Sequence, residues 1–194
     1  MPRPSLKNQR TKEILDAFER CIIESGIANT SLEQIADEAQ MKRSILRHYI
    51  GNKEDLVIAL GERWYRQTAE EWAVFIETLE GKKNRVEKVL NNLFTIWGPE
   101  YQQSLAVGEA LFSEAKRQPS LKALLTEWLD SFAESLAYEL LLEYPSASKK
   151  DCVTVGHGLI GIYLMSESLA PLGMPGRYHS NLKQSARRLV RSLG

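Results

Sequence analysis

The side chains best suited to bind a ligand by charge and hydrogen bonds lie in one short stretch, residues 40–53. It holds four Lys or Arg residues and no acid, in a chain with 25 basic and 25 acidic residues. Lys and Arg neutralise phosphates, Arg can read the edge of a guanine, and Ser or His can bond the backbone or a base. The stretch therefore indicates contact with double-stranded DNA. Its candidate DNA-binding residues are Lys42, Arg43, Ser44, Arg47, His48, Tyr49 and Lys53.

The flanking residues predict how this stretch is held. Thr30 and Ser31 each have Glu or Gln three residues on, so either could close a capping box at a helix start. Apolar residues then recur at helical spacing, the phase breaks near Gln40, and a second short helix follows with Leu46 and Ile50 inward. A helix this short is not stable alone. Two short helices joined by a turn, the second with a polar outer face, are typical of a helix-turn-helix.

The same region resembles the N-terminal DNA-binding domain of the tetracycline-repressor-like (TetR) family, over residues 9–60. The matching motifs are Thr30-Ser31-x-x-x-Ile35-Ala36, Leu46-Arg47-His48-Tyr49 and Asn52-Lys53-Glu54-x-Leu56. The resemblance implies an all-helical, dimeric, ligand-responsive transcription regulator. It also implies DNA contacts by Thr30, Ser31, Lys42, Arg43, Ser44, His48, Tyr49 and Lys53.

The sequence departs from the family pattern at three positions. Gln40 stands where the turn usually has Gly, and such turns often need a positive φ that a non-Gly residue adopts at some cost. Arg47 replaces the usual aromatic residue, and we include it in the DNA-binding set as part of the basic face. Ile50 replaces a common Phe, which is a change within the core.

Composition and the N-terminal sequence indicate where the protein is located and which kinds of site it lacks. No apolar run approaches the roughly 18 residues of a membrane span, and the basic N-terminus lacks the apolar segment of a signal peptide. We expect a cytoplasmic protein. Cys21 and Cys152 lack metal-ligand spacing and are expected to be free thiols, with redox sensing as the alternative. We expect neither a metal nor a cofactor.

The rest of the chain predicts an all-α fold. A first helix over residues 8–25 ends at Gly26, and a long helix begins after Asn52 and continues to about residue 79. Five further helical segments follow, over residues 85–97, 101–117, 120–144, 148–170 and 177–193. We expect a DNA-binding domain with a basic arm over residues 1–52, joined by the long helix to a ligand-binding and dimerisation domain over residues 53–194.

Three glycines in one helix, Gly156, Gly158 and Gly161, indicate close helix–helix approach, since each weakens a helix by about 1 kcal/mol relative to Ala. By resemblance, residues 148–170 and 177–193 would form the homodimer surface. The alternative is close packing inside one subunit.

The helical body is rich in aromatic residues that could line a partly apolar effector pocket. The candidates are Trp72, Trp97, Tyr101, Phe112, Trp128, Phe132, His157 and Tyr163. The alternative interpretation is that they are core residues.

These features predict a ligand-responsive dimeric regulator, a repressor released from a pseudo-palindromic operator by a small molecule. The alternative is a small-molecule-binding helical dimer without operator-specific DNA binding. An enzyme is not expected, because the sequence has no nucleophile elbow, metal cluster, phosphate loop or paired-carboxylate motif.

Overall fold

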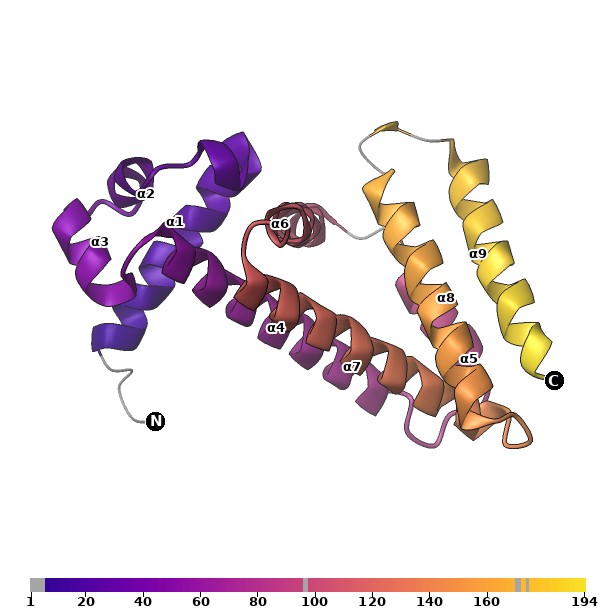
Figure 1. Ribbon diagram of the computed structural model, residues 1–194. Coiled ribbons are helices and arrows are strands. Elements are labelled where there is room, and N and C mark those ends of the chain that lie inside the picture. The colour runs from indigo at the N-terminus through magenta and orange to yellow at the C-terminus, as the bar shows by residue number, and fades with distance from the viewer. Residues whose placement is uncertain (1–5, 96–97, 170–171, 174) are drawn as a thin grey trace. The chain divides into compact units, whose positions relative to one another are not determined.

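The computed structural model describes residues 6–95, 98–169, 172–173 and 175–194. Within these ranges the chain forms helices and no strand, which confirms the predicted all-α class. None of the described helices is long and apolar enough to cross a membrane. The helices (Figure 1) are α1 Leu6–Asn29, α2 Leu32–Glu38, α3 Arg43–Ile50, α4 Lys53–Glu77, α5 Arg85–Leu93, α6 Pro99–Glu114, α7 Pro119–Glu143, α8 Lys149–Ser168 and α9 Gly176–Val190, with a 3₁₀ turn η2 over Arg191–Leu193.

The helices pack into two compact units that do not follow chain order. The first, here called the head, comprises residues 1–68 and 98–126, and the second, the body, comprises residues 69–97 and 127–194. The head therefore includes α6 and the start of α7 besides α1, α2 and α3. The functional boundary predicted between residues 52 and 53 remains a prediction, because this division describes packing alone.

The core of the head is built on the apolar stripe of α1, where Ile14 and Phe18 are fully buried. The stripe packs against α2, α3 and α6. Helical dihedral angles stop at Gly26, whose φ is 77°, and a short helical piece continues to Asn29. The predicted helix end at Gly26 is therefore confirmed as a break in α1.

Helix α4 is fixed to α1 by a buried arginine. Arg63 donates to Asp16 at 2.6 Å and pairs with Glu19 at 2.6 Å. Burial raises the pKa of Asp16, but hydrogen bonds from Lys12 and Arg63 outweigh it and hold that pKa below its ordinary value. The carboxylate thus stays charged, and the pairing holds the first part of α4 against α1, on which α2 and α3 also pack.

Helix α6 joins the head through Trp64. The Trp64 indole N–H donates to the Ser104 carbonyl at 3.1 Å, and Phe112 packs edge-on against the same ring. A Cβ added at Gly108 would come within 2.8 Å of that indole, so only glycine permits this approach.

In the body, ion pairs connect helices that pack around a shared apolar core. Arg85 donates to Glu139 of α7 at 2.7 and 2.8 Å, and Glu139 is almost fully buried. Arg187 of α9 pairs with Glu87 of α5. These contacts order α5, α7 and α9 around the apolar residues of α8.

The glycines of α8 have different surroundings. A Cβ at Gly156 would lie 2.9 Å from the Ala133 carbonyl oxygen of α7, and one at Gly158 would lie 2.6 Å from the Leu189 side chain of α9. At these two positions the alternative of close packing inside one subunit is confirmed. Gly161 instead is exposed and has no described atom near an added Cβ.

Candidate DNA interface and aromatic cluster

Helix α3, which carries most of the predicted DNA-binding residues, is held by one fully buried side chain. Leu46 is 0% exposed and packs into the core of the head. Because α3 has only eight residues, this burial and its packing on α1 and α2 must hold it in place. The opposite side of α3 is left for a ligand.

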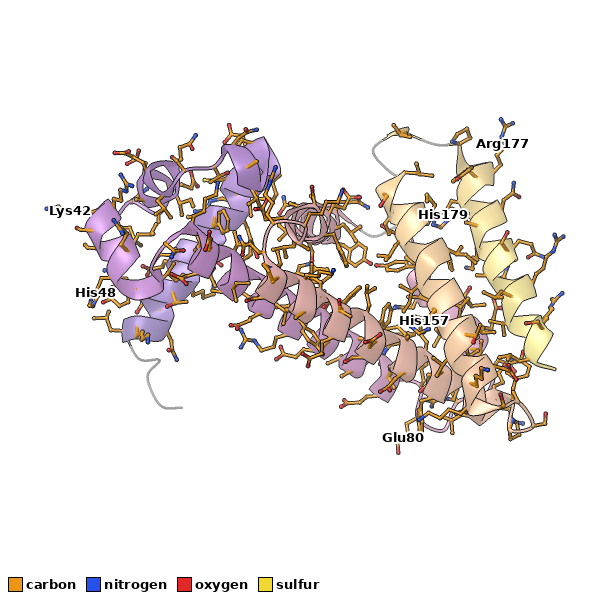
Figure 2. The ribbon with its side chains drawn as sticks, viewed as in Figure 1. Lys42, His48, Glu80, His157, Arg177 and His179 are labelled. Atoms are coloured by element: carbon orange, nitrogen blue, oxygen red, sulfur yellow. The ribbon has the colours of Figure 1, made fainter. Side chains whose placement is uncertain are left out.

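Most of the predicted DNA-binding side chains lie on that opposite side. Figure 2 shows Lys42 and His48 projecting outward from the two ends of α3. Tyr49, which packs edge-on against His48 with ring centroids 5.2 Å apart, is half-buried, as is Lys53. The exposed members of the set are Ser31, Lys42, Arg43, Ser44, Arg47 and His48.

Ser31, and not Thr30, closes the capping box of α2. The Ser31 hydroxyl accepts from the Gln34 amide at 3.2 Å, and the Ser31 amide donates to the Gln34 side chain at 2.8 Å. Thr30 is 1% exposed, and its hydroxyl donates to the Gly26 carbonyl at 2.8 Å. Its side chain is thus used inside the head, and we withdraw it from the residues expected to contact DNA.

The turn between α2 and α3 has the expected geometry. Gln40 has a φ of 52°, so the left-handed conformation predicted at this position is confirmed despite the missing glycine. The amide of Met41 then donates to the Ala36 carbonyl at 2.9 Å, which closes the turn.

The start of α4 is capped as predicted. The Asn52 side chain accepts from the Asp55 amide at 3.0 Å, and the Asn52 amide donates to the Asp55 carboxylate at 2.9 Å. Lys53, a cation at a helix N-terminus, reaches the Ala28 carbonyl at 3.3 Å. This hydrogen bond gives the Lys53 ammonium group a partner within the protein itself. Contact between Lys53 and a DNA phosphate remains a prediction.

The charged groups on the exposed side of α3 favour a polyanion as partner. Arg43 lies 3.8 Å from Glu33 of α2, and both side chains are exposed. Such a surface pair is worth about 0–1 kcal/mol. A phosphate could therefore replace Glu33 as the partner of Arg43 at little cost.

A shallow groove of about 330 Å³ separates the start of α1 from α3. This groove was not predicted, although Ile45 stands in the sequence as an apolar residue among polar ones. The groove is lined by Leu6, Arg10, Ser44, Ile45, His48 and Tyr49.

Four of the predicted effector-site aromatics form one cluster in the body. Phe132 is its centre, with ring centroids 5.0 Å from Trp72, 5.6 Å from Trp128 and 6.4 Å from Tyr163. The Trp72 indole donates to the Ser135 hydroxyl at 2.7 Å. One turn beyond Tyr163, the buried Ser166 hydroxyl has no hydrogen-bond partner among the described residues.

The other predicted effector-site residues do not join this cluster. Tyr101 and Phe112 belong to the head. His157 is exposed, and its ring nitrogen lies 3.0 Å from the Val153 carbonyl of its own helix (Figure 2). We therefore withdraw His157 from the cluster. Trp97 lies outside the described residues.

Both cysteines are free, as expected. Burial raises the pKa of the Cys152 thiol, with a smaller effect from Asp151. Burial and then Glu38 and Glu24 raise the pKa of Cys21. Redox-sensing thiols need a lowered pKa, so these shifts disfavour that alternative.

The N-terminal part of the chain matches a known protein family. The sequence model described as "Bacterial regulatory proteins, tetR family" matches residues 14–60, which run from α1 into α4. The HTH-type transcriptional regulator BetI of Brucella abortus (strain 2308) is 23% identical over 167 residues, covering 84% of this chain and 83% of that protein.

Solved structures share the fold. A TetR transcription regulator from Haloarcula marismortui matches with a TM-score of 0.73 at 17% identity, covering 95% of this chain and 98% of that one. A protein from Saccharomonospora viridis, solved in complex with choline, matches with a TM-score of 0.77 at 15% identity, covering 95% and 96%. The matches to the tetR family model and to BetI indicate a DNA-binding transcription regulator rather than an enzyme. Residues 14–60, which contain the helix-turn-helix, belong to the family described as bacterial regulatory proteins, tetR family.

Proposed function

We propose that the protein is a cytoplasmic, homodimeric transcriptional repressor that leaves a pseudo-palindromic operator when its body binds a small organic cation. The observation that carries the DNA-binding part is the acid-free outer face of α3, exposed opposite the buried Leu46. That face presents Arg, Lys, Ser and His together, the side chains that contact phosphates and base edges. It fits the DNA major groove, which admits one α-helix.

The dimer is proposed to form through residues 148–170 and 177–193. Beyond its first turn, the exposed face of α8 carries no charged residue, which is unusual for solvent and common at interfaces. Gly161 leaves open space there, and Met165 is 51% exposed beside it. The exposed face of α8 consists of Lys150, Thr154, His157, Gly161, Met165 and Ser168. A two-fold dimer would set two copies of α3 about 34–36 Å apart, one turn of DNA.

The effector is proposed to be a hydroxylated quaternary ammonium cation such as choline. Rings attract quaternary ammonium groups through their π faces, each contact being worth about 0.5–2 kcal/mol. The cluster offers Trp72, Trp128, Phe132 and Tyr163 for this role. Ser166 supplies an unused hydroxyl, which costs about 1–3 kcal/mol while unpaired. The choline complex of the similarly folded Saccharomonospora viridis protein supports this choice.

Release from DNA requires that the effector bind the DNA-free arrangement more tightly than the DNA-bound one. A ligand with equal affinity for both would shift nothing. We therefore propose both together: the protein without effector represses, and the bound cation releases it from DNA.

The first prediction concerns DNA. Selection from a random duplex library should enrich a pseudo-palindromic site, and fluorescence anisotropy should show tight binding that weakens steeply between 50 and 200 mM salt. Enrichment of no sequence, with only non-specific affinity, would favour the alternative of a small-molecule-binding helical dimer without an operator.

The second prediction concerns Arg43. Arg43→Ala should weaken operator binding about tenfold or more and lower the slope of log affinity against log salt by about one. Arg117→Ala is the matched control, because Arg117 is also an exposed arginine paired with a glutamate, Glu114. Equal affinities for both variants, with unchanged circular dichroism, would remove α3 as the reading helix.

The third prediction concerns the dimer. Met165→Glu should yield monomers in sedimentation velocity, because it places two charges in the proposed interface. Val74→Glu, at a side chain 63% exposed on α4, should leave the dimer intact. A dimeric Met165→Glu variant would refute the α8 interface.

The fourth prediction concerns the effector. Choline and tetramethylammonium should both change tryptophan fluorescence. Ser166→Ala should lower choline affinity about three- to tenfold, the worth of one hydrogen bond, and leave tetramethylammonium affinity unchanged. Ser168→Ala, exposed two residues away, is the control. No response to either cation would exclude the proposed effector class.

A further inference from the structure

Ile45 is an apolar residue on a reading face that is otherwise polar. It is 39% exposed, whereas its helix neighbour Leu46 is fully buried. Exposure alone would need no explanation, since single exposed apolar residues are common and Ile23 of α1 is 44% exposed as well. What distinguishes Ile45 is its location.

Ile45 lies on the outward face of α3. Lys42, Ile45 and His48 follow one another at three-residue intervals, so their side chains share one side of the helix. Figure 2 shows the two outer members of this row, Lys42 and His48, pointing away from the head. Ile45 is therefore flanked on both sides by groups that can bind DNA.

Ile45 also lines the groove between α1 and α3. Leu6, 63% exposed, supplies a second apolar wall, while Arg10, Ser44 and His48 supply polar groups. Because these polar groups are cationic or hydrogen-bonding and α3 carries no acid, the surroundings favour an anionic partner over an apolar peptide.

We propose that Ile45 is a specificity-determining residue that packs against the C5-methyl group of a thymine in each operator half-site. The thymine methyl is the apolar feature that base pairs present in the major groove. An isoleucine can make no hydrogen bond, so it contributes to sequence choice by burying this methyl. The proposal rests on the proposed function, because it requires α3 to enter the major groove.

The test replaces each operator thymine in turn by deoxyuridine, which lacks only the methyl group. For the unaltered protein, one symmetric pair of substitutions should weaken binding about fourfold per half-site, the value expected for burial of one methyl group. Ile45→Ala should bind the thymine operator more weakly and should lose its sensitivity at that pair. Ile23→Ala, a matched exposed isoleucine outside the groove, should behave as the unaltered protein does.

The outcomes separate this proposal from the function on which it rests. If the unaltered protein prefers no operator, the proposed function fails. If it binds an operator specifically but no deoxyuridine substitution changes its affinity, or if Ile45→Ala keeps the full sensitivity, the proposal for Ile45 is overturned. Thermal unfolding of Ile45→Ala should match that of Ile23→Ala, which confirms that both variants are folded.

Discussion

The surface proposed to read DNA depends on the burial of Leu46. An eight-residue helix is unstable in water, since the free energy of its few hydrogen bonds does not offset the cost of nucleation. Packing of Leu46 against the core built on Phe18 supplies the missing stabilisation. The left-handed Gln40 then sets the direction in which α3 leaves the turn. Every polar group on the outer face takes its position from these two local constraints.

Much of this organisation was predictable, because it is encoded by neighbours in sequence. The cap at Asn52 follows from its side chain and an acid three residues on, and it forms. The assignment of Thr30 was not predictable, since Thr30 and Ser31 both satisfy the capping pattern and a contact with Gly26 decides between them. Helical periodicity marked Phe112 and Phe132 as inward-facing but could not place them in different units.

The two units share helices, and this gives the proposed response to an effector a physical route. Residues 53–68 of α4 belong to the head, and the rest of α4 belongs to the body. Trp72, beside the cluster centre Phe132, lies about two and a half helical turns from Arg63. Arg63 is paired with Asp16 and Glu19 of α1. An effector that alters the packing around Trp72 would act on α4, the helix that also carries Arg63 of the head. The difference between the effector's affinities for the DNA-free and DNA-bound arrangements of the protein limits the size of the response.

The most direct test of the central claim, that α3 reads the major groove, is a dimethyl sulfate protection experiment on the selected operator. Dimethyl sulfate methylates guanine N7, which lies in the major groove. The account predicts protection of guanines in two half-sites whose centres are one helical turn apart, about 10–10.5 base pairs, or a multiple of that distance. Specific binding without protection of any guanine N7 in an operator whose half-sites contain guanine would contradict it.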